Sequence, residues 1–448
     1  MAHDLPSLAE DILTAARQAG ADAADALVSQ ATSVNITIQS RKLEQAERSE
    51  GVDLGLRVMV GQRQACVSVS DTNASTIQMM AERAVAMAKD APEDATIGLA
   101  EPGQLAQSWD LAALDLAEAG AEIDPAQLEQ DARAAEDAAF AVEGISQVES
   151  AGASFSQRAM HLAATNGFSG GYSKTDHSLY CVAITGSGTE MERDYFGDSR
   201  TYRSALLSAE EIGTTAAERT LARAGARKPP TGTFPVFYDE RVSSSLMMHL
   251  LSAINGAAIA RGSSWLRDAL ESQVLPESLS LIEDPHRPQI AGSRPFDAEG
   301  LPTQKRAIID KGVLTSWTLD LGTGRKLGMA STANAVRSAS APPHPSVGNV
   351  ELTGPNHARD DLLAQMGTGL LVTSLMGSTI NPTTGDYSRG AAGLWVENGV
   401  PQYPVNECTI AGNLRDMLMR IIPADDARGH LSRVVPSILI EDMIIAGA

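Results

Sequence analysis

The residues best able to do chemistry together lie in one glycine-flanked segment in the last quarter of the chain. It reads Gly385-Asp386-Tyr387-Ser388-Arg389-Gly390, and Asn413 ends the strand patterns that follow it. A carboxylate, a phenol, a guanidinium and an amide can shape a loop by bonding to one another, or they can grip a peptide terminus. We take Asp386, Tyr387, Arg389 and Asn413 as candidates for either role, and favour a local ion pair between Asp386 and Arg389.

The histidines do not form a metal-binding pattern. No two of the eight lie within five residues of each other, so the H-x₃₋₄-H spacing is absent. Asp176-His177, and Glu407-Cys408 with His430, bring ligand types together, but such pairs arise by chance in a chain of this length. His249 lies one position off an apolar helical stripe and is expected to pack or to face solvent. Neither a G-x-S-x-G elbow nor a G-x-x-x-x-G-K-[ST] phosphate loop occurs.

Several short motifs, taken together with the segment above, resemble the PmbA (also called TldE) branch of the TldD/PmbA family. The resemblance extends over essentially the whole chain and is strongest from about Phe234 onward. The further motifs are Pro295-Phe296-Asp297-Ala298-Glu299-Gly300, Gly312-Val313-Leu314-Thr315, Arg325-Lys326-Leu327-Gly328, Met366-Gly367-Thr368-Gly369-Leu370, Leu375-Met376-Gly377 and Ile410-Ala411-Gly412-Asn413-Leu414.

The resemblance implies that this chain lacks the zinc site of its sister branch. In the TldD branch, one helix carries an HExxxH motif, whose histidines bind zinc and whose glutamate acts as the base, and a cysteine near the C-terminus adds a ligand. Here Ser252, Ala253 and Ala257 match the histidine, glutamate and histidine, in a helix that begins near Glu240. No cysteine follows Cys408. We therefore expect no catalytic residue and no metal ligand in this chain, and zinc in the partner subunit.

The function implied by the resemblance is that of a subunit in a heterodimeric TldD/TldE-type zinc metallopeptidase. The family acts on unfolded peptides and microcin-type precursors and is linked to modulation of DNA gyrase. A TldD-like subunit is the expected partner, and this chain alone is expected to be non-catalytic. Two alternatives stay open: a stand-alone homodimeric peptide-binding or regulatory protein, and a peptidase with an unrecognised site.

The composition indicates which classes of partner and which cellular compartment to expect. The 448 residues carry a net charge of −21, which argues against nucleic acid or an anionic membrane as a primary partner. No apolar run reaches 18 residues, so no membrane span is expected. Three widely spaced cysteines, Cys66, Cys181 and Cys408, are typical of a reducing compartment. We expect a cytoplasmic protein.

The strand and helix patterns that must position these residues predict an α+β protein of two domains. Residues 1–228 are expected to form helices packed on an antiparallel sheet, and residues 229–448 a mostly antiparallel β domain with a few helices. Residues 227–230, Arg-Lys-Pro-Pro, mark the boundary. Strand patterns in the first domain lie at 34–38, 52–58, 146–156, 159–166 and 178–185, and helix patterns at 8–19, 77–87, 125–142 and 209–224.

A hairpin is predicted at Asn398-Gly399, because this pair between two extended apolar stretches favours positive φ at both residues. The small residues 390–393 allow a second backbone to approach closely. That backbone is either an extended substrate pairing with a free strand edge or a strand of the domain's own core. We expect the second domain to supply the main oligomer interface and one wall of a peptide-holding cavity.

Overall fold

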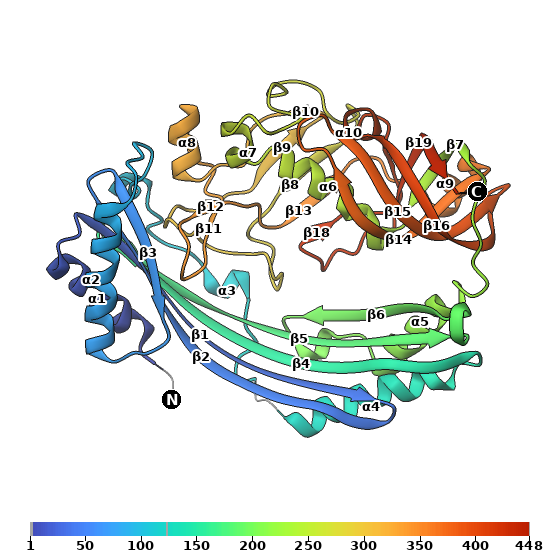
Figure 1. Ribbon diagram of the computed structural model, residues 1–448, viewed down its shortest axis with the longest axis horizontal. Coiled ribbons are helices and arrows are strands. Elements are labelled where there is room, and N and C mark those ends of the chain that lie inside the picture. Colours follow the sequence, from blue (N-terminus) through green and yellow to red (C-terminus); the bar gives the residue numbers. More distant parts are fainter. Residues whose placement is uncertain (1–2, 122–123, 448) are drawn as a thin grey trace.

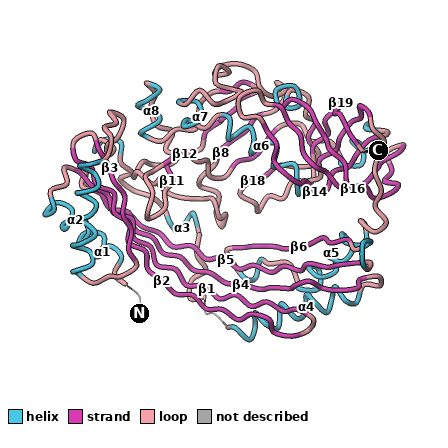
Figure 2. The backbone as a smooth tube through the Cα atoms, viewed as in Figure 1, coloured by secondary structure: helices cyan, strands magenta, loops and turns pink. Residues whose placement is uncertain are grey.

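The protein consists of two layers that lie one above the other in Figure 1. The computed structural model describes residues 3–121 and 124–447. A long curved sheet, whose last strand ends at Arg200, forms the lower layer, and the strands that begin at Gly232 lie in the upper layer (Figures 1 and 2). Helices accompany both layers, which confirms the predicted α+β class.

The lower sheet contains six antiparallel strands in the order β3-β2-β1-β4-β5-β6. Their bounds are β1 Ala23–Gln39, β2 Lys42–Val60, β3 Arg63–Val69, β4 Ile145–Ala164, β5 Ser169–Thr185 and β6 Glu192–Arg200. The separate strands predicted at 146–156 and 159–166 are one strand, β4. Its pairing with β1 continues through Gln157 and Arg158, so the polar residues there do not end it.

One face of this sheet is covered by two pairs of helices. The pairs are α1 (Leu5–Ala19) with α2 (Ala74–Asp90), and α4 (Pro125–Ala141) with α5 (Ala209–Leu221). Side chains alternate between faces along a strand. Ala24, Ala26 and Val28 of β1 therefore pack with α1 and α2, and Val34, Ile36 and Ile38 of the same strand pack with α4 and α5. A single long strand thus serves both helix pairs.

The opposite face of the sheet packs against the upper domain. Leu27 of β1 and Leu162 of β4 are buried in one apolar cluster with Phe168 and Phe296. Phe296 also lies edge-on to Trp109, at a centroid distance of 4.9 Å. Since Phe296 belongs to the segment after residue 229, this cluster is where the two domains share a core.

The upper domain is built on two main sheets. The larger has the order β16-β15-β14-β7-β19-β17, with an added pairing of β16 to β19, and the smaller has the order β10-β9-β8-β13-β18. Pairing is antiparallel except for β7 with β14 and β13 with β18. The bounds are β7 Gly232–Tyr238, β8 Ser280–Glu283, β9 Arg306–Asp310, β10 Val313–Leu314, β11 Ala335–Val336, β12 His344–Pro345, β13 Val350–Thr353, β14 Gly369–Ile380, β15 Asp386–Glu397, β16 Val400–Asn413, β17 Ile422–Pro423, β18 Arg433–Val434 and β19 Ile438–Ala446.

Helix α6 (Glu240–Ala253) occupies the core between these sheets. Leu246, Leu250 and Ile254 are fully buried and share one cluster with residues of both sheets, as their four-residue spacing predicts. The remaining helices are α3 Leu111–Leu114, α7 Gly256–Ala260, α8 Leu321–Leu327, α9 Arg359–Met366 and α10 Leu414–Leu418, with 3₁₀ turns at Pro102–Gln104, Gly188–Glu190 and Arg203–Ala205. Over residues 3–121 and 124–447, no helix has the length and apolarity needed to cross a bilayer.

The hairpin predicted at Asn398-Gly399 joins β15 to β16. Glu397 pairs with Val400, which leaves a two-residue turn. The φ angles of Asn398 and Gly399 are 52° and 77°, so the prediction of positive φ at both residues is confirmed. The turn also packs on α9, because the Gly399 amide donates to the Gly367 carbonyl at 2.8 Å.

Replacing Gly399 by valine is expected to lower the free energy of unfolding by roughly 1–3 kcal/mol, because a β-branched residue is strained at positive φ. A Cβ at this position would also lie 2.8 Å from Cα of Ala364. Denaturant unfolding followed by circular dichroism measures the change. Gly51→Val is the matched control, since its Cβ would meet nothing within 4 Å, and its midpoint should stay near wild type. An unchanged midpoint for Gly399→Val would contradict the assigned strain.

Candidate functional site

Asp386 and Asn413 hold the shape of the loop at the start of β15. They are register partners across β15 and β16, and the Asn413 amide donates to Asp386 Oδ1 at 3.1 Å. Thr384 Oγ1 donates to Asp386 Oδ2 at 2.6 Å. The Thr384 hydroxyl, followed by the Asn413 amide, holds the pKa of the Asp386 carboxyl below its usual range. The Asn413 Oδ1 atom also caps α10 by accepting the Arg415 amide at 3.0 Å. Both side chains are thus engaged in architecture.

Arg389 does not join this loop network. Residues three apart on a strand face opposite sides of the sheet, so Asp386 and Arg389 diverge. No ion pair joins them within the described part of the chain, where Asp386 bonds Thr384 and Asn413 instead, and the predicted local pair is wrong. Tyr387 and Arg389, two residues apart, share the face that is turned toward the core.

Tyr387 and Arg389 meet Tyr238 and His249, and we call these four residues the α6 polar cluster. The Tyr238 hydroxyl donates to the Tyr387 hydroxyl at 3.4 Å, and the Tyr387 ring lies edge-on to the His249 ring with centroids 6.0 Å apart. Burial raises the pKa of both phenols. Burial, followed by the charge of Arg389, lowers the pKa of His249. At neutral pH the cluster therefore contains two protonated phenols, a neutral imidazole and one cation.

Hydrogen-bonding capacity is left over in the α6 polar cluster. His249 Nε2 and Arg389 Nε are both buried and have no partner in the structure. Buried polar groups without partners are costly, so each one calls for an explanation. An electron-rich group, such as a carbonyl or carboxylate oxygen, suits the Arg389 Nε–H and its positive charge, and neutral His249 donates to it in the tautomer protonated at Nε2. A divalent cation does not, because Arg389 would repel it.

The residues present do not fit a zinc ion. The expected continuous helix through Ser252, Ala253 and Ala257 is wrong, since α6 ends at Ala253 and Asn255 caps α7, which holds Ala257. Throughout residues 3–121 and 124–447, no three His, Cys, Asp or Glu side chains gather closely enough to hold a metal. Burial raises the pKa of the Cys408 thiol to about 11, which opposes the thiolate that zinc requires. We therefore derive no chemical step through zinc in this chain.

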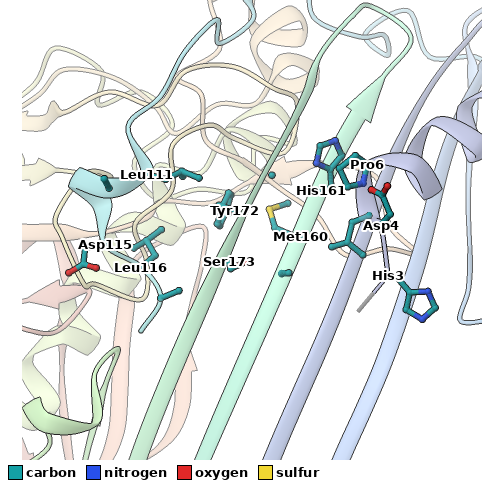
Figure 3. Close-up of a pocket in the computed structure, with 15 residues that line it drawn as sticks. His3, Asp4, Pro6, Leu111, Asp115, Leu116, Met160, His161, Tyr172 and Ser173 are labelled. Atoms are coloured by element: carbon teal, nitrogen blue, oxygen red, sulfur yellow. The ribbon is translucent and has the colours of Figure 1, made fainter. Parts of the chain in front are cut away.

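A wide cavity of about 720 Å³ lies elsewhere, on the lower sheet between the start of α1 and α3 (Figure 3). Its polar groups have structural partners. Asp4 accepts the Ser7 hydroxyl at 2.8 Å, and Asp115 accepts from Tyr202 and Gln289. His161 lies 2.9 Å from the Ser169 hydroxyl. The cavity is large, but both of its carboxylates already accept hydrogen bonds from neighbouring side chains. We therefore assign no chemistry to it.

Comparison with known proteins identifies the family. Models of the PmbA/TldA metallopeptidase match residues 24–88 (domain 1), 118–224 (central domain) and 231–447 (C-terminal domain). Metalloprotease PmbA of Escherichia coli O157:H7 is 36% identical over 95% of this chain and 92% of its own length. The chain belongs to the PmbA/TldD metallopeptidase family.

Other members of the PmbA/TldD family and their folds agree with this assignment. A metalloprotease PmbA homologue of Haemophilus influenzae is 37% identical over 96% of this chain and 94% of its own length. A Bacteroides thetaiotaomicron structure, described as a candidate modulator of DNA gyrase, has a TM-score of 0.92 at 26% identity and covers all of both chains. TldE of Thermococcus kodakarensis has a TM-score of 0.84 at 19% identity, covers 98% of this chain and 99% of its own, and shows the fold alone.

Sequence reasoning found half of the α6 polar cluster and missed the other half. Tyr387 and Arg389 belong to a dense motif, whereas Tyr238 ends a short apolar strand and His249 was expected to pack or face solvent. His249 does pack, on Tyr387, but only the fold places its imidazole beside Arg389. The available signal was weak: a histidine bordering an apolar stripe usually has a purely structural role.

Arg389→Met is expected to raise the pKa of His249 toward its ordinary value of about 6.5, because a repelling charge is removed. In wild type the unfolded chain takes up this proton before the folded chain does. The His249 contribution to stability is therefore complete above about pH 6.5 and declines as pH falls through the lowered folded pKa. Removing the guanidinium narrows that pH window.

Titration of the imidazole resonances by NMR measures this change. His161 is the internal control, because burial lowers its pKa and Arg389 is not among the causes. We expect His249 to shift and His161 to stay. A His249 pKa that is the same in wild type and variant would show that Arg389 does not act on it.

Proposed function

We propose that this protein is the non-metal-binding subunit of a two-chain zinc metallopeptidase that acts on peptides. A TldD-like relative would bind zinc, and this chain would shape the assembly and its peptide-holding cavity. Membership of a metallopeptidase family supports the class of reaction. The proposed substrates are unfolded peptides and microcin-type precursors, and the proposed compartment is the cytoplasm. A role in modulating DNA gyrase would then follow from peptide degradation.

The observation that carries the proposal is the composition of α6 and its surroundings. Its inner face is apolar, its one histidine lies beside Arg389, and Ser252 and Ala253 have no metal-binding side chain. Three convergent ligands and an open position for water are what a catalytic zinc needs. A chain of a metallopeptidase family built in this way is best explained as a supporting subunit.

The second domain is the proposed oligomer interface, but peptide pairing at residues 390–393 is not supported. β15 is bonded to β14 on one side and to β16 on the other, so it offers no free edge. A Cβ on Gly393 would lie 1.9 Å from the Leu371 carbonyl oxygen, which shows that the small residue serves the domain's own sheet. Exposed Met376, Val400 and Ile444 lie on β14, β16 and β19 and are of the kind that interface cores favour.

A homodimeric peptide-binding protein is the competing candidate. The unpartnered polar atoms of the α6 polar cluster support this candidate as much as they support the two-chain peptidase. They suit a peptide carbonyl whether or not a catalytic partner is bound. Co-purification from cells separates the two: a TldD-like chain held in a defined ratio supports the proposed pair, and a homodimer alone overturns it.

The isolated chain is expected to bind no stoichiometric zinc and to hydrolyse no peptide, because the residues near α6 supply no ligand set. Mass spectrometry of the purified metal content and a peptidase assay with a fluorogenic peptide measure both properties. The same assay after addition of the TldD-like chain is the positive control. One zinc per chain with chelator-sensitive cleavage by the isolated protein would refute the proposal.

Arg389→Ala is expected to lower kcat/KM of the reconstituted pair by about 10- to 100-fold, the equivalent of one hydrogen bond to a charged group. Thermal stability should stay nearly intact, since Arg389 Nε makes no hydrogen bond and the side chain's bond to Tyr387 is the contact that is lost. Arg48→Ala is the matched control, because Arg48 is an exposed arginine of the lower sheet paired with Glu50. Early unfolding, or cleavage at the wild-type rate, would show that Arg389 is purely architectural.

A further inference from the structure

A second cavity, which we call the inter-domain pocket, lies where the lower sheet meets the upper domain. Its volume is about 240 Å³, and it is lined by Leu27 of β1, Arg158 and Met160 of β4, Tyr172 and Lys174 of β5, and segments 294–298 and 335–337. Residues 335–337 include β11, which lies on the side of the upper domain that is turned toward the sheet (Figure 1). The pocket thus requires both domains.

Four cationic side chains line the inter-domain pocket: Arg158, Lys174, Arg294 and Arg337. This concentration is unusual in a chain whose net charge is −21. Burial, followed by the charges of Arg294 and Arg158, lowers the pKa of Lys174 to about 8. The cations are therefore close enough to repel one another, and an anion between them would relieve that repulsion.

The carboxylates nearby offset these cations only in part, since the lining has one carboxylate, Asp297, on which the charge of Arg294 acts. Asp297 is the acidic residue in the lining, and its oxygens accept backbone amides of Glu299, Leu301 and Ala335 at 2.9 to 3.1 Å. Asp25 lies behind Arg337 and is shared between Arg337 and Arg57. Asp25 thus pairs with two guanidinium groups, and the charges of Glu299 and Asp320 also act on Arg57.

Two of the cations also have buried donors without partners. The Arg337 side chain is fully buried and Arg294 is 9% exposed, yet Arg337 Nη2 and Arg294 Nε make no hydrogen bond. Lys174 Nζ donates to the carbonyls of Ala291 and Ser293 at 2.6 and 2.7 Å, which leaves its third proton free. The guanidinium and ammonium groups of the lining suit the oxygens of a carboxylate or a phosphate, and the two enclosed donors would reach such oxygens after a side-chain shift.

The rest of the lining is largely apolar, and this favours an anion that carries an apolar group. Leu27, Met160, Phe296 and Val336 contribute to the walls. The volume is below the range typical of drug-sized ligands, so the pocket suits a group of one or two residues. A carboxylate next to an apolar side chain matches both parts of the lining better than a free phosphate does.

We propose that the inter-domain pocket binds the C-terminal carboxylate of a peptide whose last side chain is apolar. This rests on the proposed function only in taking peptides as the ligands. The motif at 295–300 then acquires a role: Phe296 supplies apolar wall, and Asp297 bonds the backbone of its own loop and of β11. Arg294, next to the motif, donates from Nη2 to the Ser346 carbonyl at 3.0 Å and lines the pocket.

Calorimetric titration of the isolated full chain tests the proposal. The ligands are a pentapeptide ending in leucine with a free C-terminus, the same peptide as its C-terminal amide, and inorganic phosphate. The free acid should bind at least about tenfold more tightly than the amide, because the amide lacks the charge. Equal binding of acid and amide would overturn the proposal, and so would phosphate binding as tightly as the acid.

Variants locate the binding. Arg158→Gln changes an exposed cation at the pocket and Lys174→Met removes a half-buried one, and each should weaken the free acid by about tenfold. Arg48→Gln, on an exposed part of β2, should bind like wild type. If Lys174→Met fails to fold, the affinity of Arg158→Gln for the free acid decides whether binding occurs at the pocket. Wild-type affinity in Arg158→Gln would overturn the assignment.

Failure of this inference is distinguishable from failure of the proposed function. The titration needs neither zinc nor a partner, whereas the proposed function is tested by metal content and by the reconstituted peptidase. Suppose that the reconstituted pair cleaves peptides, but the isolated chain binds the free acid and the amide equally. That result would support the proposed function and refute the assignment of the inter-domain pocket.

Discussion

A buried ionic contact joins the two domains next to their shared apolar cluster and constrains how they meet. Asp25 of β1 lies opposite Arg57 of β2 and binds its guanidinium at 2.5 Å, while Arg337 reaches the same carboxylate from the upper domain. All three side chains are at most 4% exposed. Removing one partner of such a contact leaves an uncompensated buried charge, which typically costs about 3–5 kcal/mol. The contact therefore helps to hold β11 against the sheet, together with the bond from the Ala335 amide to Asp297, and Arg337 lines the inter-domain pocket.

Away from that contact, each domain buries its own apolar residues in its own way. The long strands of the lower sheet present alternate residues to the helices and to the upper domain, so one sheet has two cores. In the upper domain, α6 is enclosed by two sheets and its polar neighbours are trapped with it. Arg389 and His249 stay beside each other because β15 and α6 cannot separate without opening this core. The electrostatics of the α6 polar cluster follow from packing.

The two sites thus share a physical character in an otherwise acidic protein. Both place cationic or donor groups in buried surroundings and leave some of those donors without a partner. In a medium of low dielectric constant such groups interact strongly with electron-rich ligands. This character agrees with a protein that handles peptide carbonyls and carboxylates, and it disagrees with one that holds a divalent cation. Family membership gives the reaction class, and these sites suggest how the chain contributes to it.

The sequence by itself determined the fold class, the α6 face, the Asn398-Gly399 turn and the family, because each depends on local periodicity, local backbone preference or contiguous motifs. Only the tertiary structure decided which residues meet. It separated Asp386 from Arg389, since strand alternation sends them to opposite faces, and it ended α6 before Ala257. It also closed both edges of β15 and brought Arg158 and Lys174 beside Arg294 and Arg337. Arg158 and Lys174 lie 120 to 179 positions before Arg294 and Arg337, and no local pattern predicts a contact made by the packing of one domain on another.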